Sequence, residues 1–275
     1  MSSSSPIGSP RLLTSFAAIA AVALGAGAWI GSSFDGAPDA PATMAAVSEA
    51  GAPPQPVDAE FGNKVRDYLM ENPQVLVEAI NVLEVRQREA EAQNGRVLVE
   101  TNKAEIFNSA SDWVGGNPDG DITVVEFLDY RCSYCRKAME EVTQLIEKDG
   151  NIRFVIKEFP ILGQDSELSA RFAIAVKQTS GDELYFKIHD ALMMLRGTVT
   201  LETLGKMADE FGADKDAVFK LMNEEEVSAV LRANHQLAER LQISGTPAFV
   251  IGGDMLKGYA PLETLQEIVE SERNL

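Results

Sequence analysis

The chain has 275 residues, of which 45% are hydrophobic, so it can bury one sizeable core and carry an accessory segment. Its formal net charge of −18 and its isoelectric point near 4.5 argue against binding to nucleic acid and to anionic membrane surfaces. The chain contains two cysteines, which do not by themselves reveal a redox compartment.

The N-terminus divides into an apolar run and a linker. Leu12 to Ile30 contains no charged residue, and Arg11 is the one early positive side chain. The run has a length between that of a secretory signal and that of a short membrane span. We expect residues 1–31 to be a signal peptide or a membrane anchor, and both alternatives stay open. Residues 32–57 are rich in Ala, Pro, Gly and Ser, which predicts a flexible linker.

Residues 58–112 show helical periodicity. The Asn-Pro pair at 72–73 is typical of an N-cap followed by a first-turn proline, so a second helix is predicted to begin there. Leu69, Leu76 and Leu83 fall seven residues apart, which is the spacing of apolar positions in a coiled coil. We expect two short helices and a longer one that either pack onto the next domain or form an oligomerisation segment.

Cys132 and Cys135 follow an apolar run that predicts a strand over Asp121–Leu128, and a helical pattern begins at once after them. The spacing places both sulfurs on one face of the first helical turn, close enough for a disulfide. The N-terminus of a helix stabilises a thiolate. A structural disulfide across so short a loop would remove only about 2 kcal/mol of chain entropy. The motif therefore predicts a redox-active dithiol.

Glu126 is a carboxylate inside a strand that is otherwise suited to burial. It lies either at an edge facing solvent or partly buried near the cysteines, where it would accept and return protons as the thiols ionise. A further strand is predicted over Asn151–Phe159. In that strand Lys157 or Glu158 faces the active site, and alternation alone does not decide between them.

The region from Ser166 to Leu241 is predicted to form a series of amphipathic helices. Breaks near Gly181, Gly197, Gly212 and Asn223 predict about five of them.

These features together resemble the DsbA-like bacterial thiol-disulfide oxidoreductases. The resemblance rests on the strand–CxxC–helix order with Glu126 ahead of the cysteines, on the long helical stretch, and on Gly245-Thr246-Pro247 before a late strand. It implies an α/β fold of the thioredoxin type over residues 113–275, with a helical insertion at about 165–241. The N-terminal helical segment precedes that domain.

The resemblance also assigns roles near the thiols. It implies that Cys132 forms a mixed disulfide with a protein substrate and that Cys135 resolves it. Ser133 and Tyr134 are expected to tune the reduction potential and to contact the substrate. No cofactor is expected beyond the Cys132–Cys135 disulfide itself.

Thr246 and Pro247 are predicted substrate-binding residues. The resemblance implies that Pro247 is cis and lies against the CxxC motif, which leaves the backbone of Thr246 free to pair with an extended substrate. It also favours the buried alternative for Glu126, as a third catalytic residue.

The stretch DYLMENPQVLVEAI, residues 67–80, resembles the N-terminal segment of ScsC-type and Com1-like proteins, which form oligomers. This favours a homo-oligomer, and the seven-residue spacing does not separate a dimer from a trimer. Together with the threonine before the proline, it favours a disulfide isomerase or reductase. A DsbA-type oxidase is the alternative.

The family implies a periplasmic location, either soluble after signal cleavage or anchored in the inner membrane by residues 12–30. Expected partners are misfolded or cysteine-containing exported proteins and a membrane redox protein. That protein would be a DsbD-like reductase, or a DsbB-like oxidase in the alternative. A hypothesis of another class is copper tolerance, with Cu(I) held by the two thiolates. It ranks second because the chain lacks a Met- or His-rich cluster.

Overall fold

The computed structural model describes residues 58–275, so the predicted signal peptide or anchor and the predicted linker lie outside the described residues. Within residues 58–275, none of the helices is both long and apolar enough to cross a membrane.

A mixed sheet lies at the centre of the fold, with strand order β1–β3–β2–β4–β5. The strands are β1 (Trp113–Gly116), β2 (Ile122–Leu128), β3 (Ile152–Glu158), β4 (Ala248–Ile251) and β5 (Asp254–Lys257). β2 runs parallel to β3, and the other three pairings are antiparallel. A parallel pair requires a crossover, and α3 (Ser133–Asp149) supplies it.

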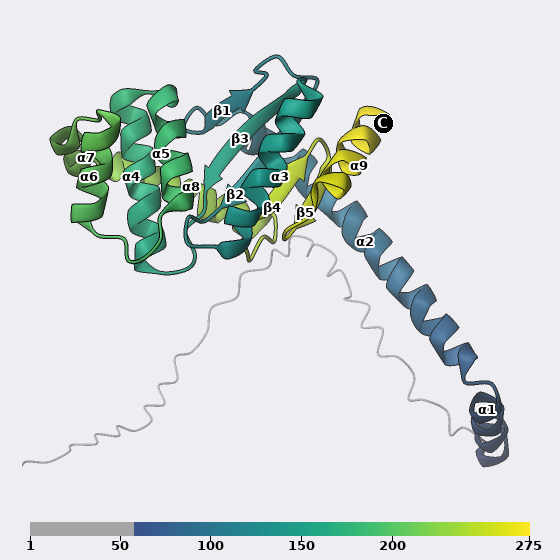
Figure 1. Ribbon diagram of the computed structural model, residues 1–275. Coiled ribbons are helices and arrows are strands. Elements are labelled where there is room, and N and C mark those ends of the chain that lie inside the picture. The colour runs from purple at the N-terminus through teal and green to yellow at the C-terminus, as the bar shows by residue number, and fades with distance from the viewer. Residues whose placement is uncertain (1–57) are drawn as a thin grey trace, which may run out of the picture. The chain divides into compact units, whose positions relative to one another are not determined.

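Helices cover both faces of the sheet (Figure 1). One face packs against α3 and α9 (Leu262–Arg273), and the other packs against the end of α2 (Gln74–Phe107) and against α8 (Glu225–Arg240). Alternate residues of a strand point to opposite faces, so Val124 and Leu128 join the first core while Val125 and Phe127 join the second. Glu126 therefore shares the α3 face of β2.

The predicted helical insertion is confirmed. It consists of α4 (Gln164–Ser180), α5 (Asp182–Met194), α6 (Leu201–Phe211), α7 (Lys215–Leu221) and α8. Each predicted break lies between two of these helices. Gly212 ends α6 in the left-handed conformation, with φ of 79°, where a side chain would be strained.

The prediction of three N-terminal helices is wrong. α1 (Ala59–Glu71) is followed by one continuous helix of 34 residues, α2, because the charged run from Glu84 to Gln93 consists mostly of good helix formers. The side chain of Asn72 does not cap α2. It donates instead to the carbonyl oxygen of Tyr68 at 2.9 Å and so ends α1.

The two ends of α2 differ in burial. Its buried residues are Gly95, Val99, Asn102 and Ile106, and none of the described residues before Gly95 is buried. The C-terminal half of α2 is therefore part of the core of the thioredoxin domain, whereas the first half leaves its apolar side chains exposed.

β1 was not predicted. It has only four residues, two of them glycines, and its partner β3 lies about 40 residues further along the chain. Trp113 at its start is buried, and its indole N–H donates to the carbonyl oxygen of Asp182 at 3.0 Å.

Candidate active site

The two cysteines lie at the start of α3, as the spacing predicts. Cys132 occupies the N-cap position with extended backbone, and Cys135 lies one turn into the helix. Both are free thiols; Cys132 is 7% exposed and Cys135 is 0% exposed. The thiol nearer the helix end is thus the one that a substrate can reach.

The peptide bond between Thr246 and Pro247 is cis, as the resemblance implied. The Cys132 sulfur lies 3.2 Å from the carbonyl oxygen of Thr246, so the loop before β4 contacts the reactive thiol directly. Pro247 is buried, whereas Thr246 remains partly exposed. Residues more than 110 positions apart in the chain therefore meet at one sulfur.

The pKa of Cys132 is lowered to about 5 from an ordinary value of 9.0. The largest cause is a hydrogen bond from the Cys135 thiol to the Cys132 thiolate, whereas burial raises the pKa and so opposes this effect. The Thr246 side chain and the backbone N–H groups of Cys135 and Tyr134 stabilise the thiolate further. When protonated, the same sulfur donates to Thr246. At neutral pH Cys132 is therefore a thiolate that is ready to attack a disulfide.

The pKa of Cys135 is strongly raised. Its proton is held by the Cys132 sulfur, and burial and the nearby charge of Glu126 disfavour a second thiolate. The two thiols have the same chemistry, and their surroundings shift their pKa values in opposite directions. Cys135 therefore needs a base before it can act as a nucleophile.

Glu126 is 3% exposed and lies on a central strand, with Ile156 of β3 and Phe249 of β4 as its register partners. The solvent-facing edge alternative is therefore wrong. Its Oε1 has no hydrogen-bond partner among the described residues. Burial and then the Cys132 thiolate raise the pKa of Glu126 to about 8. It is a carboxyl group that can exchange a proton close to neutral pH.

Ser133 and Tyr134 are exposed between the two cysteines, and Tyr134 is 61% exposed. Tyr134 lies beside Tyr259 with ring centroids 6.3 Å apart, and the ammonium of Lys137 lies 4.1 Å from the centre of the Tyr259 ring. An aromatic surface that carries one positive charge thus lies next to Cys132.

Sequence reasoning missed a buried polar cluster behind the Cys132 loop. Tyr130 and Tyr185 both donate to Oε1 of Glu158 at 2.7 Å, and the Tyr130 hydroxyl lies 3.2 Å from Nδ1 of His189. Burial raises the pKa of Glu158 to about 8 and lowers that of His189 to about 3. Because β3 is buried on both faces, its sequence does not show which of the two faces points toward the thiols.

Lys157 lies on the opposite face of β3 from Glu158. It forms an ion pair with Asp112 and donates to the carbonyl oxygen of Glu105 at 2.8 Å. Glu158, and not Lys157, therefore points toward the α3 side of the sheet. Lys157 holds the end of α2 against the domain.

Two side chains brace the loop that carries Cys132. Arg136 donates to the carbonyl oxygens of Tyr130 and Leu195 at 2.8 and 3.0 Å, which ties the loop to the helical insertion. The carboxylate of Asp129 accepts from the backbone N–H groups of residues 131, 161 and 162. The thiols are thus held on a rigid support.

The part of the chain that the structure describes holds no cluster of three or more His, Cys, Asp or Glu side chains placed for a metal ion. Cys132 and Cys135 are the soft ligands that a Cu(I) ion would use.

Comparison with protein families identifies the family in which this geometry occurs. The model of the DSBA-like thioredoxin domain matches residues 123–270, which is more than half of the chain. The chain belongs to the DsbA-like thioredoxin family. Residues 59–90 match the model of the copper resistance protein ScsC N-terminal domain, as the resemblance of residues 67–80 implied.

Solved structures of this family align with most of the domain. A thioredoxin-like oxidoreductase from Silicibacter pomeroyi is 38% identical with a TM-score of 0.60, and covers 63% of this chain and 99% of its own. BcfH from Salmonella enterica Typhimurium is 29% identical with a TM-score of 0.66, over 78% of this chain and 95% of its own.

A curated relative is much longer than this chain. The Na⁺/H⁺ antiporter NhaA 1 of Salinispora arenicola is 27% identical over 161 residues, which are 58% of this chain and 24% of the relative. The chain thus spans about a quarter of that protein's length.

Proposed function

We propose that this DsbA-family protein is a periplasmic thiol-disulfide oxidoreductase that rearranges or reduces disulfides in exported proteins. The observation that carries the proposal is the Cys132 sulfur, which lies at the N-terminus of α3 and against Thr246, with a pKa lowered to about 5. Such a thiolate is both a nucleophile and a good leaving group at neutral pH.

The first step is attack of the Cys132 thiolate on one sulfur of a client disulfide. The client S–S bond breaks, a mixed disulfide forms, and the second client sulfur leaves as a thiolate. The client backbone lies along Thr246 and Pro247, and its side chains contact Ser133 and Tyr134. Attack by another client thiolate on the mixed disulfide then returns Cys132, so isomerisation needs no net supply of electrons.

The second route releases a reduced client. Glu126 takes the proton of Cys135, and the new thiolate attacks the Cys132 sulfur. The client leaves with both electrons, and the chain is left with the Cys132–Cys135 disulfide. A DsbD-like membrane reductase restores the dithiol.

The N-terminal helices support an isomerase function over a DsbA-type oxidase function. Leu76 and Leu83 are half exposed or more, as are Phe61, Tyr68 and Ile80. A helix pair with so many exposed apolar side chains fits a contact with further copies of this chain. Residues 59–94 then join two or three copies, so that several active sites face one misfolded client.

A DsbA-type oxidase is the alternative, and the lowered pKa of Cys132 fits this function as well. A thiolate stabilised to this degree makes the reduced form more stable and the disulfide more oxidising. In that case a DsbB-like oxidase completes the cycle. In either direction the periplasmic location and the membrane partner are part of the proposal.

Reactivation of scrambled ribonuclease by the purified full-length chain tests the direction of electron flow. Recovery that requires pre-reduction of the chain and that is lost in Cys132→Ser supports an isomerase. Rapid oxidation of reduced ribonuclease by the disulfide form, with no recovery of the scrambled form, supports the oxidase.

The double variant Leu76→Glu/Leu83→Glu tests the oligomer. We expect light scattering to give the mass of a dimer or a trimer for the wild-type chain and of a monomer for the variant, which then loses isomerisation. The matched control is Glu78→Gln/Glu84→Gln, which changes exposed polar residues of the same helix and leaves the mass unchanged. A wild-type monomer contradicts the oligomeric mechanism.

A further inference from the structure

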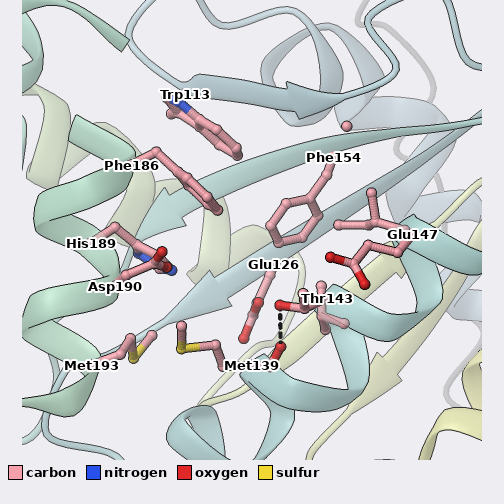
Figure 2. A pocket seen from close by; sticks show the side chains of 13 residues that line it. Trp113, Glu126, Met139, Thr143, Glu147, Phe154, Phe186, His189, Asp190 and Met193 are labelled. Atoms are coloured by element: carbon pink, nitrogen blue, oxygen red, sulfur yellow. Dashed lines mark hydrogen bonds between the residues drawn. The ribbon is translucent and has the colours of Figure 1, made fainter. Parts of the chain in front are cut away.

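A pocket of about 300 Å³ lies on the α3 face of the sheet, between α3 and α5 (Figure 2). Its walls are aromatic and sulfur-bearing, with Trp113, Phe154, Phe186, Met139 and Met193. Trp113 stacks on Phe186 with centroids 4.7 Å apart and meets Phe154 edge-on at 6.2 Å. The volume is at the lower end of sites that hold small organic molecules.

The pocket lies behind the thiols and does not include them. Met139 follows Cys135 by four residues on α3, so the helix face that carries the buried thiol continues into the pocket wall. Glu126 lines the pocket, and Figure 2 shows its side chain between the α3 and α5 walls. Its Oε1 is buried and lacks a hydrogen-bond partner among the described residues.

The hydrogen-bonding groups of the lining favour a cation. Glu147 and Asp190 join Glu126 as carboxyl groups, and none of the lining residues is Lys or Arg. Three lining side chains that can donate already have partners within the protein. The Thr143 hydroxyl donates to the carbonyl oxygen of Met139 at 2.7 Å, and the Trp113 N–H donates to the carbonyl oxygen of Asp182. Nδ1 of His189 lies 3.2 Å from the Tyr130 hydroxyl. The lining therefore offers acceptors and ring faces, both of which attract a positive charge.

We propose that this pocket binds a small aromatic or alkyl ammonium ion, whose cationic nitrogen pairs with Glu126 while its apolar part packs against Trp113, Phe154 and Phe186. Each part of the site has a matching part in such a ligand. The unpartnered oxygen gains a charged donor, and the ring faces and the two methionines enclose the hydrocarbon. The proposal goes beyond the redox activity and does not depend on its direction.

Binding is coupled to protonation of Glu126. Glu126 interacts electrostatically with Cys132 and Cys135, at the start of α3. The other titratable residues of the pocket are Glu147 on α3 and His189 and Asp190 on α5. Ile156 and Phe249, which flank Glu126 on β3 and β4, do not titrate. In the reduced chain the pKa of Glu126 is about 8, and the cation pairs with the ionised form. Affinity therefore rises by roughly 50-fold between pH 6 and pH 8, because the ionised fraction rises by that factor.

Three probes with one ring system test the proposal: tryptamine, which is a cation, tryptophol, which is neutral, and indole-3-acetate, which is an anion. Titration calorimetry with the full-length reduced chain at pH 8 is expected to show that tryptamine binds at least tenfold more tightly than indole-3-acetate, with tryptophol between them. Equal binding of the three probes, or no binding of tryptamine, overturns the proposal.

Two variants locate the site. Glu126→Gln is expected to reduce tryptamine affinity at least tenfold, to leave tryptophol affinity within about threefold, and to remove the pH dependence. Glu140→Gln, which changes an exposed glutamate of α3 outside the pocket, is the matched control. Phe186→Ala, a partly exposed wall residue, weakens all three probes even if Glu126→Gln fails to fold. Unchanged tryptamine binding in Phe186→Ala places the ligand elsewhere and contradicts the proposal.

Discussion

The thioredoxin domain and the N-terminal helices depart from the usual distribution of side chains in opposite directions. The domain buries Glu126, Glu158, Lys157 and His189, whereas α1 and the first half of α2 leave apolar residues such as Leu83 exposed. Burying an ionisable group is costly unless it is paired or neutral, and exposing a large apolar surface is costly unless a partner covers it.

Each departure is informative about function because each carries a free-energy cost. In the domain, burial raises the pKa of Glu126 to about 8, and the hydrogen bond from Cys135 lowers the pKa of Cys132 to about 5. Both shifts prepare the site for thiol exchange. In the N-terminal segment, exposure leaves an apolar face uncovered within the chain. The first region is prepared by its own fold, whereas the second is completed by further copies of the chain in the proposed oligomer.

The largest expected effect is on Cys132. Cys132→Ser removes the nucleophile, so thiol-disulfide exchange is expected to fall by about 10³-fold or more. Cys135→Ser keeps the nucleophile and loses the resolving thiol, so mixed disulfides with clients are expected to accumulate on non-reducing gels. Equal activity of Cys132→Ser and the wild-type chain contradicts the assignment.

Lys157 tests the buried ionic contacts of the domain. Lys157→Ala leaves Asp112 buried without its partner and the carbonyl of Glu105 without its donor. We expect a loss of about 3–5 kcal/mol in the free energy of unfolding, measured by denaturant titration. The double variant Lys157→Met/Asp112→Leu removes both charges and is expected to recover most of this loss. If Lys157→Ala is as stable as the wild-type chain, the ion pair does not hold the end of α2 against the domain.

The two halves of α2 provide a direct contrast in stability. Ile106 is 0% exposed and Leu83 is 63% exposed. Ile106→Ala is expected to lower the free energy of unfolding by about 2–5 kcal/mol. Leu83→Ala is expected to change it by less than about 0.5 kcal/mol, at a protein concentration low enough to keep the chain monomeric. Similar losses in the two variants contradict the separation of α2 into a core half and an association half.

Glu126→Gln is expected to slow release of the client from the mixed disulfide by about 10- to 100-fold. The sign of the pH dependence follows from the raised pKa: Glu126 accepts a proton only when ionised, so in the wild-type chain the rate rises as pH increases through about 8. Rapid-quench measurements of the resolving step should show this rise, and Glu126→Gln should lack it. A wild-type rate that does not change across this range excludes Glu126 as the base. Glu140→Gln is the control.

The local parts of the site were predictable, and the parts made by distant residues were not. The CxxC motif, Glu126 and the proline before β4 each have a short sequence signature, and the five insertion helices have glycines or an asparagine between them. β1 was not predicted because its pairing with β3 is long-range and half of its residues are glycines. The cluster of Tyr130, Glu158 and Tyr185 was not predicted because its members come from the loop before α3, from β3 and from α5, and carry no periodicity.

The continuity of α2 was also mispredicted, for a physical reason. The charged run from Glu84 to Gln93 lacks an apolar stripe, yet a helix without a buried face needs no such stripe, so α2 continues through the run. This part of α2 is exposed, since none of its residues is buried within the chain.

Titration of the Cys132 thiolate tests the central claim, which is that the fold prepares this sulfur to attack disulfides at neutral pH. The far-ultraviolet absorbance of the thiolate in the reduced chain, followed against pH with Cys132→Ser as the blank, is expected to rise with a midpoint near pH 5. Because the pKa is lowered, the thiolate is present above this midpoint and is lost as the pH falls through it. A midpoint close to 9.0, the ordinary value for a thiol, would contradict the account.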